Sequence, residues 1–242
     1  MNITDLFESE DFDSMLRGEA VKAYDTFMRR MNVESINGYE SLLAIDTGPF
    51  YGGYIVPAEK VGLKQYGVYA VVFLPKDGRV RASLGKHKSG EIVLFFNVLL
   101  EDFSLKHLYT RMSGFKKDFV HEWSHHQLND RYSVNATNRD TSGIGDIDRV
   151  AYYNHPHETQ AYYQEMAFEA LEFFKTVSEY ASTKLEKFSN MTTPELVSFI
   201  KEKFGSEEFV SSLNQKNMRA LDKRLARMIE ETLRPSYLNK PH

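Results

Sequence analysis

Two histidines and a glutamate near the middle of the chain have the types and spacing of a metal-dependent hydrolytic site. His121, Glu122 and His125 form the pattern His-Glu-x-x-His. In a helix, residues four apart lie on one face one turn apart, so the two imidazoles could hold one metal ion, most often zinc. The Glu122 carboxylate beside them could take a proton from a water bound to that ion. The alternative is a surface helix that carries these residues by coincidence.

A catalytic zinc ion needs a third protein ligand and an open position for water. One known arrangement continues the motif with a glycine and a third histidine. Leu128 and Arg131 occupy those two positions here, so that arrangement is absent. The third ligand must therefore come from another element of the chain.

Glu158 is the residue that we expect to complete the site. A new helix is predicted to begin at Pro156, since proline suits the first turn of a helix, and Glu158 falls in that turn. Ala161 lies one turn further on the same face, where its small side chain would allow another helix to approach closely. His155, His157 and an aspartate from the preceding loop are the alternative ligands.

The composition limits the partners and the kind of metal site. The 242 residues contain no cysteine, which excludes thiolate zinc sites and leaves histidine and carboxylate as ligands. A net charge of −4 gives no electrostatic case for nucleic-acid binding. The longest apolar run, residues 92–100, is too short to span a membrane, and the first residues lack the pattern of a signal peptide. We therefore expect a cytoplasmic protein with neither a nucleic-acid nor a membrane partner.

The order of the expected elements places a block of strands before the motif helix. Three strands, predicted at residues 68–74, 79–84 and 91–96, form an antiparallel meander. Helices are predicted at residues 18–31, 105–112, 115–129 and 156–180, with two or three more between 193 and 234 that end at Pro235. Residues 1–15 are expected to be weakly ordered or a short acidic helix, 44–60 a loop with at most one short strand, and 130–156 a polar loop.

At these residues the chain resembles the zincin metallopeptidases. His121-Glu122-x-x-His125 matches their motif helix, and Glu158-x-x-Ala161 resembles the glutamate helix of the gluzincin branch. The sequence Phe-Val-His-Glu-x-x-His, a loop and then His-Pro-x-Glu-x-x-Ala-Tyr is also similar to small metallopeptidases encoded by bacteriophages. The resemblance covers residues 68–180 and implies an α+β, zincin-like fold. In that fold a small antiparallel sheet packs on the motif helix and the glutamate helix, and the third strand borders the cleft.

The resemblance also implies a domain division and an activity. Residues 1–180 would form the metallopeptidase domain, and residues 181–242 a C-terminal helical extension packed on it. The activity would be zinc-dependent hydrolysis of a protein or peptide substrate, with Zn2+ as cofactor, Glu122 as general base, and a location inside a bacterial host of the phage. The oligomeric state stays open.

Tyr162 is the candidate for stabilising the negative charge that develops on the substrate carbonyl oxygen. It lies one turn after Glu158 on the expected ligand face, and Tyr153, His155 and His157 are further candidates. Packing in the core is the alternative role for the Tyr162 ring. The edge of the third predicted strand could pair with the backbone of an extended peptide substrate.

Two other readings of the function stay open. The chain could be a non-catalytic interaction or virion protein in which the metal only staples the fold, or a toxin or regulatory protease that acts on one partner protein. Glu122 argues against the first, because a purely structural metal site needs no general base. Hydrolysis of a generic protein such as casein would favour a broad protease over both.

Overall fold

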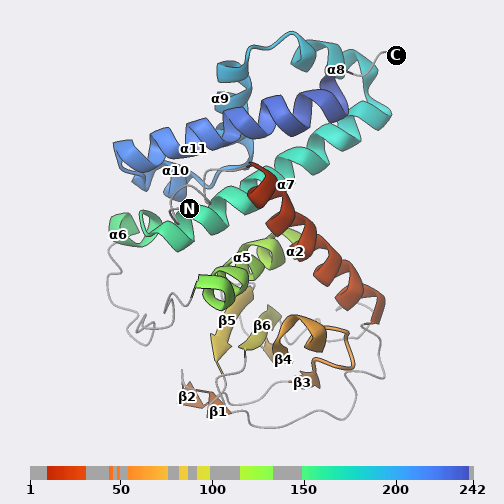
Figure 1. Ribbon diagram of the computed structural model, residues 1–242, viewed down its shortest axis with the longest axis vertical. Coiled ribbons are helices and arrows are strands. Elements are labelled where there is room, and N and C mark those ends of the chain that lie inside the picture. Colours follow the sequence, from red (N-terminus) through yellow and green to blue (C-terminus); the bar gives the residue numbers. More distant parts are fainter. Residues whose placement is uncertain are drawn as a thin grey trace. The chain divides into compact units, whose positions relative to one another are not determined.

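The computed structural model describes residues 10–30, 44–45, 48–49, 54–75, 82–86, 92–98, 115–132 and 149–239 (Figure 1). The chain packs as two compact units, one formed by Met1–Arg17 with Asp146–His242 and the other by Gly18–Gly145. Helix α2 (Glu10–Arg30) contributes its first residues to the former and the rest to the latter. Helix α7 (Pro156–Tyr180) groups with the C-terminal helices in this division, and the domain boundary expected at residue 180 stays a prediction.

The strand-containing unit holds a four-stranded mixed sheet. Its strands lie in the order β3 (Tyr54–Pro57), β4 (Val68–Pro75), β6 (Ile92–Val98) and β5 (Ala82–Lys86). The β3–β4 and β5–β6 pairs are antiparallel, whereas β4 and β6 run parallel. Two further short strands, β1 (Ala44–Ile45) and β2 (Gly48–Pro49), pair with each other. The protein is therefore α+β, but the expected antiparallel meander is wrong.

The burial of the strands explains this order. Val71 of β4 pairs with Leu94 of β6, and Phe73 with Phe96, and all four side chains are buried. Uninterrupted apolar runs such as these are typical of strands buried on both faces, which is where parallel pairing occurs. Strand β5 follows β4 in the chain but lies at the edge, and β6 pairs on both sides. The expectation that the third strand offers a free edge to a cleft is therefore also wrong.

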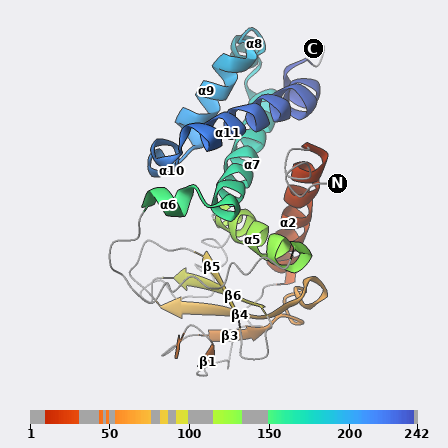
Figure 2. The ribbon, with the colours of Figure 1, turned by 60° about the vertical axis from the view of Figure 1, so that its left-hand side comes forward.

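An aromatic core joins the sheet to α5 (Lys116–Tyr132), which lies over one face of it (Figure 2). Phe27 stacks on Phe96 of the sheet with ring centroids 5.8 Å apart and on Phe119 of α5 at 6.4 Å. Trp123 stacks on Phe119 at 5.0 Å, and Tyr24 meets Phe119 edge-on at 5.2 Å. Each of these five rings is at least 97% buried, so aromatic packing fixes α5 by the side opposite its histidines.

The other unit, which contains residues 149–239, is helical. After α6 (Arg149–Tyr153) and α7 come α8 (Ser182–Ser189), α9 (Thr193–Phe204), α10 (Glu207–Ser212), α11 (Gln215–Met228) and the π-helix η4 (Ile229–Leu238). Helix α11 packs along α7 (Figure 1). The core of this unit includes the fully buried Tyr163, Phe174, Ile200 and Leu225. Of the helices that the structure describes, none combines the length and the apolar character needed to cross a membrane.

Most helix predictions agree with the structure, and some boundaries differ. Helix α7 has the predicted bounds, and α5 extends three residues beyond the predicted end at 129. Helix α2 begins at Glu10 rather than at 18, so of the two alternatives given for residues 1–15, weak order or a short helix, residues 10–15 are helical. Residues 149–153 of the expected loop form α6, and residues 44–60 hold three short strands rather than at most one. The helix predicted at 105–112 lies outside the described residues.

Pro235 does not end the last helix as predicted. The chain continues as a π-helix to Leu238, and the backbone N–H of Asn239 donates to the carbonyl of Arg234, five residues earlier, at 2.9 Å. Proline removes one backbone donor, and the wider turn of a π-helix accommodates this loss here.

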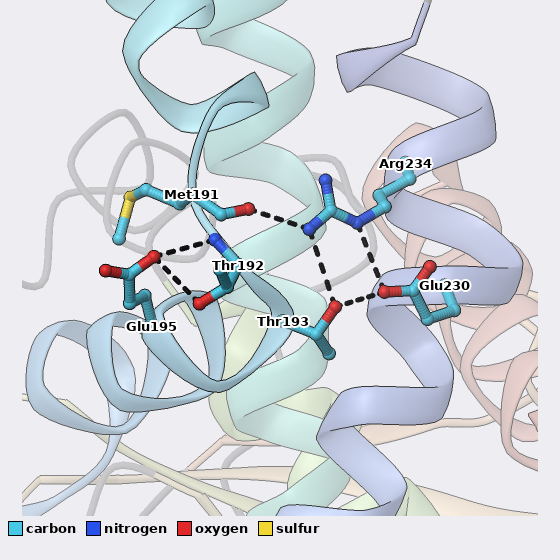
Figure 3. Close-up of polar contacts among 6 residues, drawn as sticks. All are labelled: Met191, Thr192, Thr193, Glu195, Glu230 and Arg234. Carbon is cyan, nitrogen blue, oxygen red and sulfur yellow. Dashed lines mark hydrogen bonds and ion pairs between the residues drawn. The ribbon is translucent and has the colours of Figure 1, made fainter.

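Side-chain contacts tie this π-helix to the start of α9 (Figure 3). The Arg234 guanidinium donates to the backbone carbonyl of Met191 at 2.8 Å and to the carboxylate of Glu230 at 3.2 Å. The Thr193 hydroxyl donates to the same carboxylate. These bonds hold the C-terminal end of the chain on the helical unit.

Candidate metal centre

Helix α5 presents His121 and His125 because its other face is anchored. The backbone N–H of Phe119 donates to the carbonyl of Phe115 at 2.8 Å, which forms the first turn. Phe119 and Trp123 then bury completely in the aromatic core, which sets the rotation of the helix about its axis. The two histidines fall together on another face, as the four-residue spacing predicted. Residues 121–125 are thus helical, as the motif requires.

His126 belongs to this anchor rather than to the histidine pair. It is buried, and its Nε2 bonds to the backbone carbonyl of Tyr66 at 2.6 Å. Tyr66 ends the 3-10 helix η1 (Lys64–Tyr66), and its ring meets Trp123 edge-on at 5.4 Å. Because a carbonyl only accepts hydrogen bonds, Nε2 of His126 must carry the proton.

The Nε2 atoms of His121 and His125 lie 3.3 Å apart. Two nitrogens bound to one tetrahedral zinc ion at about 2.0–2.1 Å would be separated by roughly 3.3–3.4 Å. The rings are inclined at 70° with centroids 5.1 Å apart. His121 is buried and His125 partly buried. The same separation is at the long end of the range for a hydrogen bond between imidazoles, so the pair has a geometry that suits a metal without requiring one.

Glu158 lies in the first turn of α7, as predicted. His155 caps this helix by accepting a hydrogen bond at Nδ1 from the backbone N–H of His157 at 3.4 Å, and Pro156 follows as the first residue of the helix. The exposed fraction of Glu158 is 5%. A helix N-terminus favours a negative charge, and a buried carboxylate requires a cation or hydrogen-bond donors nearby. The position therefore suits an ionised ligand.

His121, His125 and Glu158 form a group that could bind a metal ion. One potential ligand atom of each lies within 4.8 Å of those of the other two. Two imidazole nitrogens and one carboxylate oxygen make up a donor set used by catalytic zinc, and the absence of cysteine is consistent with it. The competing ligands His155 and His157 are not members of this group.

Glu122, the predicted general base, is the neighbour of His121 in α5 and is partly buried. Asp118, which the helical repeat also places near the histidines, is partly buried as well and is not part of the three-residue group. The role of Glu122 in catalysis stays a prediction.

The ring of Tyr162 is packed in the helical unit. It stacks on Phe209 of α10 with centroids 4.7 Å apart and planes at 16°, and it meets Tyr153 edge-on at 5.3 Å. Burial, with smaller contributions from the neighbouring Tyr152 and Tyr153, raises the pKa of Tyr162, so its hydroxyl keeps its proton. This environment suits the packing role considered for Tyr162. Its role as a donor to the substrate stays a prediction.

Tyr153, the second candidate donor, is engaged within the same unit. Its hydroxyl donates to the Glu208 carboxylate at 3.2 Å, and Arg149 pairs with that carboxylate at 3.0 Å. Burial is the main cause of the raised pKa of Tyr153. These contacts join α6 to α10.

One residue beside the site escaped the sequence reasoning. Asn154, between α6 and α7, bonds to residues about sixty positions away in the chain. An asparagine two residues before a helix-starting proline is a turn signal, but it carries no information on such distant partners.

Comparisons with known proteins leave the family open. No family model matches the chain, no curated protein matches its sequence, and no solved structure matches it.

Proposed function

We propose that this protein is a zinc-dependent metallopeptidase of the zincin type. The observation that supports the proposal is the grouping of His121, His125 and Glu158, since these residues come from two helices and are the ligand types that catalytic zinc uses. A structural site would fill the fourth position with another protein ligand, and among the residues that the structure describes the group has three members. His121, His125 and Glu158 would hold the ion.

Each residue of the site would have a separate role in hydrolysis. A bound zinc ion supplies a Lewis acid that activates water and polarises the scissile carbonyl. Glu122, next to His121 in α5, accepts the proton of the attacking water and returns it to the leaving amine. The Glu158 carboxylate lowers the net positive charge of the site, and the start of α7 favours a negative charge at its position.

The edge of the sheet offers a surface for the substrate backbone. In the sheet that the structure describes, β5 pairs on one side only, with β6, and it packs against α5, the helix that carries His121 and His125. An extended peptide could add to this edge through main-chain hydrogen bonds. Strand β5 therefore takes the role expected for the third strand, and this proposal limits the substrate to an extended or unfolded segment.

The test is hydrolysis of casein by the zinc-loaded protein and by Glu122→Gln. The variant removes the base and no ligand, so it should keep its zinc and its fold and lose about 10²–10⁴ in turnover. Glu172→Gln, in an exposed position of α7, is the matched control and should retain full activity. Unchanged turnover in Glu122→Gln would contradict the mechanism. A fully loaded protein without activity on casein or unfolded peptides would contradict the function and favour a metal-stapled interaction protein.

A further inference from the structure

Asn154 joins the start of α7 to a distant part of the helical unit. It follows α6 and precedes Glu158 by four residues. Its side-chain amide donates to the backbone carbonyl of Val150, the second residue of α6, at 2.7 Å. The same amide donates to the backbone carbonyl of Ser212, at the end of α10, also at 2.7 Å. The side-chain amide of Asn154 therefore donates both of its hydrogens, one to α6 and one to the end of α10.

The other end of the Asn154 side chain is occupied by the start of α11. Its Oδ1 accepts from the backbone N–H of Asn214 at 2.8 Å and from the Asn217 amide at 2.9 Å. The Asn217 amide also donates to the backbone carbonyl of Asn154 at 3.0 Å. Asn214 is itself the N-cap of α11 and accepts from the backbone N–H of Asn217 at 2.9 Å. The junction is therefore bonded to a capped helix end.

The partners leave no choice in the orientation of the Asn154 amide. Two backbone carbonyls can only accept, and a backbone N–H can only donate, so the nitrogen must face Val150 and Ser212 and the oxygen Asn214. Asparagine has two donor hydrogens and two acceptor lone pairs, and this site uses all four. An aspartate at position 154 could only accept hydrogen bonds, and the side chain of an alanine could neither accept nor donate them.

The segment that follows is fixed from the other side by α7 itself. The Thr159 hydroxyl donates to the backbone carbonyls of Tyr153 at 2.9 Å and His155 at 3.1 Å. The backbone N–H of His155 donates to the carbonyl of Tyr152 at 3.1 Å. Residues 153–155 are thus held between α7 and the turn that joins α10 to α11, which leaves the first turn of α7 little freedom.

We propose that Asn154 is a positioning residue for Glu158, through which the α10–α11 turn determines how tightly the protein binds zinc. The inference rests on the proposed function, because it takes Glu158 as a zinc ligand. A metal ion binds more tightly when its ligands are held in place before the ion arrives. Residues that contact the ligands therefore contribute strongly to metal affinity. Releasing Asn154 frees the start of α7 from α10 and α11, so Glu158 samples positions from which it cannot reach the ion.

The experiment measures zinc affinity by competition with a chromophoric chelator, at a temperature where every variant is folded. Asn154→Ala should bind zinc about tenfold or more weakly, in the range seen when residues behind a ligand are removed. Asn154→Asp keeps the acceptor bonds but turns a carboxylate oxygen toward the carbonyls of Val150 and Ser212, so it should also bind zinc more weakly than the wild type. Asn190→Ala removes an exposed asparagine of the same unit and should bind as the wild type does. Wild-type affinity in a folded Asn154→Ala protein would overturn the proposal.

A double-variant cycle shows whether Asn154 acts through Glu158. In a protein that already carries Glu158→Ala, adding Asn154→Ala should not weaken zinc binding further. If Asn154→Ala loosened the fold in general, it would weaken zinc binding as much in that background as in the wild type. If Asn154→Ala does not fold, Asn217→Ala takes its place in the experiment. It removes the two hydrogen bonds from the Asn217 amide to Asn154, and it leaves the bonds that join Asn154 to Ser212 and Asn214. Wild-type affinity in that variant would then overturn the proposal. A wild-type protein that binds no zinc would overturn the proposed function as well.

Discussion

The Nε2 atoms of His121 and His125 are separated by 3.3 Å, close to the spacing of two nitrogens on one tetrahedral ion. This relationship arises within a single helix, so it depends on neither the sheet nor the C-terminal helices. It also provides the most direct tests of the metal centre.

The first prediction concerns the stoichiometry of zinc. The purified protein should bind one zinc ion per chain, measured by elemental analysis after removal of loosely bound metal. His121→Ala and His125→Ala should each abolish this binding, because two ligands are too few to retain the ion. Zinc should also raise the melting temperature, since an ion that binds only the folded state at a hundred times its Kd stabilises it by about 2.7 kcal/mol. Full zinc occupancy in both variants would rule out the site.

The second prediction separates Glu158 from its two histidine neighbours. Glu158→Ala should weaken zinc binding sharply, while His155→Ala and His157→Ala should leave one zinc ion per chain. His155→Ala also removes the N-cap of α7 and should therefore cost about 1 kcal/mol in the free energy of unfolding without metal. The reverse pattern, with zinc lost from a histidine variant and kept by Glu158→Ala, would show that the third ligand is an imidazole.

The third prediction concerns a buried ion pair that connects α2 to α11. The Arg224 guanidinium contacts Asp13 at 2.5 Å, and the Gln160 and Gln164 amides donate to the same carboxylate at 2.9 Å each. Asp13→Ala would leave the guanidinium buried without its charge partner. We expect a loss of about 3–5 kcal/mol in the free energy of unfolding, measured by urea titration.

A half-exposed ion pair of the same unit provides the control for that measurement. Lys201 and Asp222 approach equally closely, at 2.5 Å, but the Asp222 side chain is 42% exposed, against 1% for Asp13. Asp222→Ala should cost no more than about 1 kcal/mol. Equal losses in the two variants would show that burial does not determine the strength of these pairs.

The fourth prediction uses the capping interaction at the start of α9 (Figure 3). The Glu195 carboxylate accepts from the backbone N–H of Thr192 at 2.7 Å and from its hydroxyl at 2.8 Å. These bonds, the backbone one most, lower the pKa of Glu195 below its ordinary 4.5. A lowered folded-state pKa stabilises the protein above the unfolded-state pKa, and this stability is lost as the pH falls through the folded value.

Glu195→Gln should therefore be less stable than the wild type at pH 7, and the difference should shrink as the pH falls below about 4.5. Urea midpoints measured between pH 7 and pH 3 provide the comparison. Glu202→Gln, on an exposed position of the same helix, controls for the loss of a negative charge. The same pH dependence in both variants would contradict a specific role for the cap.

Local sequence signals were sufficient for the helices that carry the site. The four-residue spacing of His121 and His125 and the position of Pro156 before Glu158 predicted α5 and the bounds of α7, because helix periodicity and capping involve neighbours in the chain. Strands around Val71 and Leu94 were predicted from their apolar runs for the same reason. Such signals operate over a few residues and need no tertiary contact.

The tertiary structure alone decided which distant segments meet. The sequence did not show that β6 inserts beside β4 and leaves β5 at the edge, because an apolar run specifies burial and not the identity of its neighbour. The bonds of Asn154 to Asn214 and of Asp13 to Arg224 join positions 60 and 211 residues apart. A polar residue in a turn or near the start of a helix has many potential partners, and only the packing of the helices selects among them. The grouping of Glu158 with His121 and His125 is of this kind, since the sequence named the three candidate ligands and only the structure brings one potential ligand atom of each within 4.8 Å of the others.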